Sequence, residues 1–199
     1  MSAPFPLAGP MSGKVSHGAA ELCVVLVEDN EHMRSLLRTL LKAMGIRRIF
    51  ECCDGTEALA QLHETKPDFI LTDLTMAPMD GLAFAHAVRH STDESLCVLP
   101  IIMVTGHTER LRIRAARDIG VTEILAKPVT AAGLYQRIDE IIQRPRPFVR
   151  TPDYCGPCRR RQQNPAYTGP WRRSSDGNRG ETIAVDEIPE PATSKLNQA

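Results

Sequence analysis

Three carboxylates stand directly after stretches of apolar residues in two separate parts of the chain. Glu28 and Asp29 follow the apolar run 22–27, and Asp73 follows the run 69–72. Short apolar runs bounded by turn residues are typical of strands buried on both faces of a parallel sheet. The carboxyl ends of such strands meet at one edge, where open α/β folds place their ligands. Because an idle carboxylate at a half-buried edge loses hydration without compensation, the pattern predicts a metal site or a reactive carboxylate.

Other polar residues follow the remaining three expected strands. They are Asp54 after 46–51, Thr105 after 98–104 and Lys127 after 121–126. Each strand-end residue has an ordinary alternative when taken alone. Asp29 would favour the start of a following helix by about 0.3–1 kcal/mol, and Thr105 and Lys127 would be loop residues. Their joint placement favours a functional site, whereas Asp54 is interpreted as a turn former and helix cap.

Helical patterns lie between the apolar runs. After Asn30, apolar residues recur at i, i+3 and i+4 spacing until Gly45, which is typical of an amphipathic helix with a side-chain cap and a closing glycine. Similar patterns follow each later run, and the polar stretch 91–97 is expected to be a loop. Five strands alternating with five helices predict an α/β fold, a doubly wound five-stranded parallel sheet around one core.

Length and composition divide the chain into one domain and two flanking segments. The 199 residues suffice for one well-buried domain with additions. Residues 1–20 are rich in proline and glycine, and 8 of the 15 prolines lie beyond residue 144. Scattered apolar residues cannot offset a backbone ordering cost of roughly 1–2 kcal/mol per residue. We therefore expect a disordered segment 1–20, a domain 21–143 and a disordered tail 144–199.

Charge is distributed unevenly, although the net charge is zero. Residues 21–143 hold 13 Lys/Arg and 18 Asp/Glu, a net charge of −5. Residues 144–179 hold 9 Arg and 2 Asp, a net charge of +7, and residues 180–199 carry −3. An acidic body with a basic arm predicts that the arm contacts an anionic surface, either that of a partner or that of the body itself.

Six cysteines do not form a secreted disulfide pattern, because several lie within apolar runs where a free thiol behaves as a small hydrophobe. No segment has the length of a signal peptide or of a membrane span, which predicts a cytoplasmic protein. Cys155 and Cys158 supply two of the four ligands that zinc requires. A zinc shared with another chain and a redox pair both stay open, and a thioredoxin-like role is excluded by the absence of a βαβ context.

The tail contains an internal repeat. Tyr154-Cys155-Gly156-Pro157-Cys158-Arg159-Arg160 recurs 13 residues later as Tyr167-Thr168-Gly169-Pro170-Trp171-Arg172-Arg173. A tyrosine, a Gly-Pro turn and an arginine pair could dock on carboxylates or phosphates through an aromatic anchor and guanidinium groups. The alternative is a solvated and unspecific arginine-rich tail, and the two interpretations are balanced.

The strand-end motifs, taken in order, resemble the response-regulator receiver domain of bacterial two-component signalling, of the chemotaxis-regulator type. The resemblance covers roughly residues 21–143, with a separation of 44 positions from Asp29 to Asp73 and of 22 from Thr105 to Lys127. The matching motifs are Val27-Glu28-Asp29-Asn30, Asp54-Gly55-Thr56-Glu57-Ala58-Leu59, Asp73 with Met79-Asp80-Gly81, Met103-Val104-Thr105-Gly106 and Lys127-Pro128. The resemblance implies a flavodoxin-like receiver fold.

The resemblance also implies a chemical role for each acid. Asp73 would be the phosphoacceptor, a carboxylate nucleophile that forms an acyl phosphate. The cofactor would be Mg²⁺, bound directly by Asp29 and Asp73, through water by Glu28, and by the backbone carbonyl of Thr75.

Lys127 and Thr105 would contact the phosphoryl group after its transfer. Lys127 would pair with Asp73 before phosphorylation and with the phosphoryl oxygens afterwards. Thr105 would move its hydroxyl towards the phosphate and change the face from the fourth strand to the fifth helix. The resemblance further implies a cis peptide bond between Lys127 and Pro128.

Three departures from the family pattern affect this site. Ala77 stands where the family has proline, with Pro78 following, so the loop near the metal would take a different path. Ile124 replaces the aromatic switch residue. Thr75 and His107 occupy positions that tune the lifetime of the acyl phosphate, so an altered lifetime is predicted.

The resulting hypothesis is a stand-alone response regulator, not an enzyme beyond slow self-phosphorylation and dephosphorylation. Its partners would be a sensor histidine kinase or phosphotransfer protein and an output protein that binds the switch face or the tail, with phosphorelay as a further route. The alternative is an adaptor that binds nucleic acid or another anionic surface through the tail. An Asp-nucleophile phosphatase of the haloacid-dehalogenase type is disfavoured, because Thr75 stands where that class has a second Asp.

Overall fold

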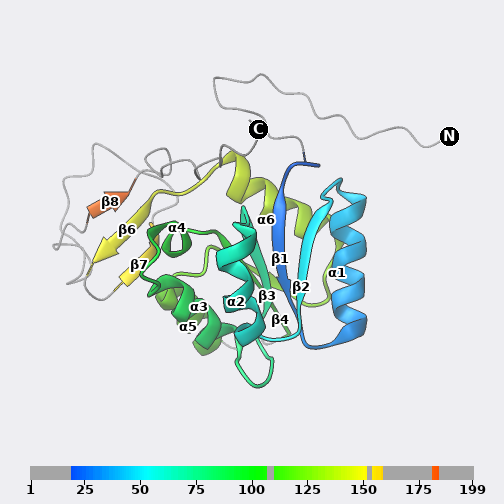
Figure 1. The fold of residues 1–199 in the computed structure, drawn as a ribbon, viewed down its shortest axis with the longest axis horizontal. Coiled ribbons are helices and arrows are strands. Elements are labelled where there is room, and N and C mark those ends of the chain that lie inside the picture. Colours follow the sequence, from blue (N-terminus) through cyan, green and yellow to red (C-terminus); the bar gives the residue numbers. More distant parts are fainter. Residues whose placement is uncertain (1–18, 107–109, 152–153, 159–180, 184–199) are drawn as a thin grey trace, which may run out of the picture.

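The computed structural model describes residues 19–106, 110–151, 154–158 and 181–183. Its main element is a five-stranded parallel sheet with the order β2-β1-β3-β4-β5 (Figure 1). The strands are β1 (Cys23–Val27), β2 (Arg48–Cys52), β3 (Phe69–Asp73), β4 (Ile101–Thr105) and β5 (Glu123–Ala126). The helices are α1 (Glu31–Ala43), α2 (Gly55–Thr65), α3 (Gly81–Arg89), α4 (Glu94–Cys97), α5 (Arg110–Ile119) and α6 (Ala131–Gln143).

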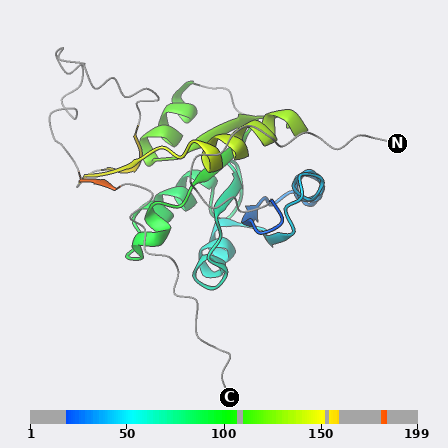
Figure 2. The ribbon, with the colours of Figure 1, turned by 90° about the horizontal axis from the view of Figure 1, so that it is seen from above.

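Helices cover both faces of the sheet, which explains why the central strands read as continuous apolar runs. On one face, α1 and α6 pack against alternate residues of β1, β3 and β4. On the other face, α2, α3 and α5 pack against the remaining residues of the same strands (Figures 1 and 2). The predicted α/β class and the doubly wound five-stranded parallel sheet are confirmed.

Side-chain caps begin the helices that border the carboxyl edge. Asn30 accepts a hydrogen bond from the backbone N–H of Met33 at the start of α1. Asp54 accepts from the N–H groups of Thr56 and Glu57 at the start of α2. The interpretation of Asp54 as a turn former and helix cap is therefore confirmed.

Residues 94–97 form a short helix where a loop was expected, so the described chain has one helix more than predicted. Asp93 caps α4 by accepting from the N–H of Ser95, and both Leu96 and Cys97 are buried. The cap and the buried apolar pair together stabilise a turn of helix in a stretch that is otherwise polar.

The tail forms a second sheet, so the prediction of a disordered segment 144–199 is wrong for its described parts. Strands β6 (Phe148–Thr151), β7 (Tyr154–Pro157) and β8 (Glu181–Ile183) are antiparallel in the order β7-β6-β8. This sheet lies beside α3, α4 and α5 (Figure 1). Tail residues Phe148 and Cys155 are buried, and this long-range burial supplies the ordering free energy that composition did not indicate.

The second copy of the tail repeat and the rest of the predicted disordered segments lie outside the described residues. This applies to 1–18 of the N-terminal segment and to 159–180 and 184–199 of the tail. Residues 19–21 form a turn that leads into β1.

Candidate functional site

The carboxyl edge of the sheet brings together the polar residues that end β1, β3, β4 and β5. Register pairs Asp73 with Val104, and Thr105 with Ala126, so the residues that end β3, β4 and β5 follow one another along this edge. Glu28, which follows β1, and Asp73 are almost fully buried, with exposed fractions of 1% and 5%. The two carboxylates therefore meet in a partly desolvated environment.

Lys127 connects these two carboxylates. Its Nζ atom lies 3.0 Å from Asp73 Oδ1 and 3.4 Å from Glu28 Oε2. Burial acts to lower the pKa of Lys127, but the hydrogen bond to Asp73 and the charges of Asp73 and Glu28 outweigh it, so the pKa is raised. The ammonium thus stays charged between the acids.

The ionised form of Glu28 is disfavoured at its position in this group. Burial and the neighbouring charge of Asp73 raise its pKa, while Lys127 and the backbone N–H of Asn30 partly oppose the shift. The Asn30 N–H donates to Glu28 Oε1 at 3.3 Å. One ammonium for two buried carboxylates leaves negative charge at this edge, which favours binding of an additional cation.

Backbone contacts fix the position of Asp73. The Thr75 N–H donates to Asp73 Oδ2 at 3.2 Å, so the two carboxylate oxygens have different partners. Gly81, the first residue of α3, lies against the carbonyl of Asp73, and a β-carbon on Gly81 would collide with that oxygen and lie 3.0 Å from Leu74 Cα. The close packing of α3 against the end of β3 therefore requires glycine here.

The donor chemistry at this edge fits Mg²⁺, although no three Asp, Glu, His or Cys side chains within the described residues already form a metal cluster. Glu28 and Asp73 share Lys127, and Asp29 is exposed at the rim. Three carboxylates and one ammonium give a local charge of −2 with hard oxygen donors, which Mg²⁺ prefers and commonly binds while keeping several waters.

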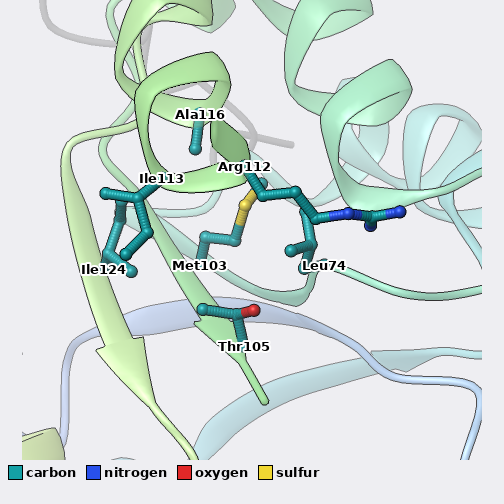
Figure 3. Close-up of a pocket in the computed structure, with 7 residues that line it drawn as sticks. All are labelled: Leu74, Met103, Thr105, Arg112, Ile113, Ala116 and Ile124. Carbon is teal, nitrogen blue, oxygen red and sulfur yellow. The ribbon is translucent and has the colours of Figure 1, made fainter. Parts of the chain in front are cut away.

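Thr105 stands at one end of an apolar pocket under α5 (Figure 3). Its side chain is buried, and Ile124 lies in the same pocket across from Met103. The remaining lining residues are Leu74, Arg112, Ile113 and Ala116. Thr105 therefore has apolar neighbours in this pocket, and one of them is Ile124, where the resemblance led us to expect an aromatic residue.

Peptide geometry agrees with one expectation near the site. The Lys127–Pro128 bond is cis as predicted, and the Ala77–Pro78 bond, at the departure from the family pattern, is cis as well. His107, expected to tune the acyl-phosphate lifetime, lies outside the described residues.

Two contributions to the site were not predicted. Arg34 donates from Nη1 to the backbone carbonyl of Glu28 at 2.7 Å, which anchors α1 to the end of β1. Gly81 was interpreted only as part of a turn. The spacing between Asp73 and the start of the next helix is short enough to have indicated close packing at Gly81, whereas nothing in the sequence indicates the partner of Arg34.

A family model for the response regulator receiver domain matches residues 24–139. The chain belongs to this family. The match begins within β1, includes the other four strands of the parallel sheet and every residue of the carboxyl-edge site, and ends within α6, before β6. Receiver domains are the signalling domains of response regulators in two-component systems, so the predicted family and signalling class are confirmed.

Two curated relatives are chemotaxis proteins. The chemotaxis protein CheY of Pseudomonas aeruginosa is 38% identical over 121 residues, which cover 61% of this chain and 96% of the relative. CheY-3 of Vibrio cholerae is 35% identical over 121 residues, covering 61% of this chain and 92% of the relative. The receiver domain of this chain thus spans nearly the whole of such relatives, and the tail is additional.

Solved receiver structures share the fold. Chemotaxis protein CheY4 of Vibrio cholerae has a TM-score of 0.57 and 27% identity, covering 61% of this chain and 98% of that one. The receiver domain of the sensor histidine kinase PA1611 of Pseudomonas aeruginosa, with a magnesium ion coordinated in its active-site cleft, has a TM-score of 0.55 and 25% identity. It covers 60% of this chain and 95% of that one.

Two further sequence expectations concern the cysteines and the membrane. Cys23, Cys52 and Cys97 are buried free thiols, as predicted. Cys155 is buried and Cys158 is partly exposed, and neither belongs to a metal cluster among the described residues. No helix in the described ranges is long and apolar enough to cross a bilayer, while the cytoplasmic location stays a prediction.

Proposed function

We propose that the chain is a phosphorylation switch in which Asp73 accepts a phosphoryl group from the phosphohistidine of a sensor kinase or phosphotransfer protein. A carboxylate oxygen of Asp73 would attack the phosphorus atom as the bond to the histidine nitrogen breaks, giving an acyl phosphate and a free imidazole. The contact of Lys127 with both Asp73 and Glu28 carries this proposal, because it places a fixed positive charge where an anionic group would arrive.

Some residues around Asp73 would bind the metal ion, and Lys127 orients the Asp73 carboxylate. Glu28, Asp29, Asp73 and the Thr75 carbonyl would hold Mg²⁺. When bound, the ion supplies positive charge that reduces the repulsion between the carboxylate and the phosphoryl group. Lys127 orients Asp73 Oδ1 before the reaction and would then donate to the phosphoryl oxygens, since an ammonium is a compact donor without fixed direction.

Thr105 would convert phosphorylation into a change of surface. A hydrogen bond from its hydroxyl to the phosphoryl group would draw the end of β4 towards Asp73 and alter the packing of α5 on the pocket that contains Ile124. An output protein would then bind the face formed by β4, α5, β5 and α6, or the tail. Phosphorelay to another protein is the second output route.

A nucleic-acid adaptor acting through the tail is less well supported. The described arginines beyond residue 143 form ion pairs with glutamates of the receiver domain. The pairs are Arg144 with Glu140, Arg146 with Glu123 and Arg150 with Glu94. The anionic surface that these arginines contact is therefore the body of the chain. Loss of nucleic-acid retention at about 0.15 M salt would dismiss the adaptor hypothesis.

Labelling with a small phosphodonor tests the proposal. We expect acetyl phosphate or phosphoramidate with Mg²⁺ to label the wild type, and Asp73→Asn to abolish the label. Asp54→Asn is the matched control, because Asp54 lies shortly after β2 but caps α2, and Asn caps comparably well. Persistent labelling of Asp73→Asn would show that another residue accepts the phosphoryl group, and phosphotransfer profiling would identify the kinase.

A further inference from the structure

A buried arginine organises the edge of the receiver domain opposite Asp73. Arg89, the last residue of α3, is 2% exposed. Its Nη1 donates to the carbonyls of Cys97 at 2.9 Å and Leu99 at 2.8 Å, and its Nε donates to the carbonyl of Gly120 at 3.0 Å. These carbonyls precede β4 and β5, so one guanidinium joins the amino ends of two strands to the end of α3.

The tail covers this arginine. The ring of Phe148 on β6 lies over the guanidinium of Arg89, with 5.1 Å between Cζ and the ring centroid. On β7, the Cys155 thiol donates to the carbonyl of Cys97 at 3.7 Å. Phe148 and Cys155 are both buried, so the tail hairpin seals a surface of the receiver domain that already presents polar groups in a fixed arrangement.

Two glycines lie against each other where the tail meets the receiver domain. Gly120 has a φ of +101°, and a β-carbon on Gly156 would lie 2.7 Å from Gly120 Cα. The same β-carbon would lie 2.6 Å from the hydroxyl oxygen of Tyr154, which donates to the carbonyl of Pro157 at 3.0 Å. Tyrosine, glycine and proline thus form one compact unit, and glycine is required where it faces the receiver domain.

The repeat preserves the residues that make this unit. Tyr167, Gly169 and Pro170 of the second copy stand where Tyr154, Gly156 and Pro157 stand in the first. Thr168 replaces Cys155 and keeps a small side chain with a donor group, so it could donate to the same carbonyl of Cys97.

The sequence before the second copy does not resemble that of β6. Residues 161–164 (Arg-Gln-Gln-Asn) occupy the place that Phe148–Thr151 has before the first copy, and none of them is apolar. Both edges of β6 are already paired, one with β7 and the other with β8. The second copy could therefore form the same strand pairing only by replacing β7.

We propose that Arg89, Cys97, Gly120 and β6 form a binding site for the Tyr-x-Gly-Pro motif, and that the segment Tyr167–Arg173 of the same chain competes with β7 for it. The tether makes this competition intramolecular, with an effective concentration on the order of mM, so a weak intrinsic affinity suffices. The tail then has two bound registers that differ by 13 residues and leave different motifs free.

Trp171, the single tryptophan of the chain, reports on the second register. In the full chain, Gly156→Ala prevents binding of the first copy by steric collision, and we expect the second copy to take its place. Trp171 emission should then shift to the blue and lose accessibility to acrylamide. In Gly156→Ala with Gly169→Ala, both copies carry the obstructing methyl group, and emission and quenching should return to those of an exposed tryptophan.

Controls separate competition from general disturbance of the tail. Gly177→Ala, outside both copies, should leave Trp171 emission as in the wild type. If Gly156→Ala prevents folding, judged by circular dichroism, Tyr154→Ala disables the first copy without the collision and gives the same comparison. Identical quenching in Gly156→Ala and the double variant would overturn the proposal, and so would a shift that depends on protein concentration, which would indicate binding between chains.

Amide hydrogen exchange of Phe148–Thr151 provides a second readout that needs no tryptophan. Protection of the β6 amides that face β7 should persist in Gly156→Ala, because the second copy takes over the pairing, and should be lost in the double variant, while the amides that face β8 serve as an internal reference. Loss of protection in Gly156→Ala alone would contradict the proposal. The outcome does not depend on Asp73, so it stands or falls separately from phosphorylation.

Discussion

Gly81 lies directly against the backbone carbonyl of Asp73, with no room for a methyl group between α3 and the end of β3. We expect Gly81→Ala to displace the Asp73 loop or the helix and to destabilise the fold by about 1–3 kcal/mol, as overpacking does. Urea denaturation measures the loss, and phosphodonor labelling measures the effect on Asp73. Gly106→Ala is the matched control for stability, because among the described residues its β-carbon would meet only Lys127 Cδ, at 4.0 Å. Equal stability of the two variants would contradict the packing argument.

Glu28→Gln should make the fold more stable at neutral pH in the absence of divalent metal. The pKa of Glu28 is raised by burial and by Asp73, so the folded state binds a proton more readily than the unfolded state. Its contribution to stability is fully present below the ordinary value of 4.5 and is lost as pH rises through the raised pKa. The advantage of Glu28→Gln should therefore vanish below about pH 4.5.

Denaturation midpoints measured across pH with EDTA test this expectation. Glu64→Gln, an exposed glutamate of α2, should show no comparable pH-dependent gain. A variant Glu28→Gln that is less stable than the wild type at neutral pH would mean that the Lys127 contact outweighs desolvation.

Magnesium should stabilise the fold through the three acids. A ligand that binds only the folded state adds about 1.4 kcal/mol at a concentration about ten times its Kd. Asp29→Asn should remove most of this stabilisation, because it deletes a carboxylate from the rim while leaving the buried Glu28–Lys127–Asp73 contacts in place. Thermal unfolding with and without Mg²⁺ measures the shift.

The control for the metal experiment is Asp54→Asn, which alters another strand-end acid. It should retain the full Mg²⁺-dependent shift, since Asp54 caps α2 instead of facing Asp73. A shift that survives in Asp29→Asn and disappears in Asp54→Asn would place the metal elsewhere.

Removing the tail after Gln143 should destabilise the receiver domain. The cut deletes Phe148, which covers Arg89, and a comparable loss of a buried aromatic side chain costs about 3–5 kcal/mol. A cut after Ile183 keeps β6, β7 and β8 and should preserve the midpoint. Chemical denaturation of both truncated chains decides the matter, and equal midpoints would show that the hairpin contributes little.

Features that depend on residues close together in the sequence were predicted, whereas features that depend on contacts between distant residues were not. The strand ends at Asp73, Thr105 and Lys127 were predicted because parallel strands leave a local pattern, an apolar run that stops at a polar residue. The helix caps Asn30 and Asp54 were equally local, as each accepts from N–H groups within the next three residues.

The tail could not be predicted in the same way, because its order depends on contacts across the fold. A proline-rich and arginine-rich stretch indicates disorder unless Gly156 is known to lie against Gly120. Arg89 reads as a solvated residue in the last turn of a helix, yet it is buried under Phe148. The loop expected at 91–97 was a different kind of error, since the capping residue Asp93 was present as a local signal.

Helix α3 has a fixed length, and its two ends are both immobilised by close contacts. Gly81 lies against the backbone carbonyl of Asp73, and Arg89, eight residues later, donates to the carbonyls before β4 and β5. A helix of this size is about 13 Å long and cannot stretch without breaking its hydrogen bonds. A displacement of the Asp73 loop would therefore be transmitted along α3 as a rigid-body shift and would reach the opposite edge of the sheet. The arginine there would move relative to the aromatic ring that caps it.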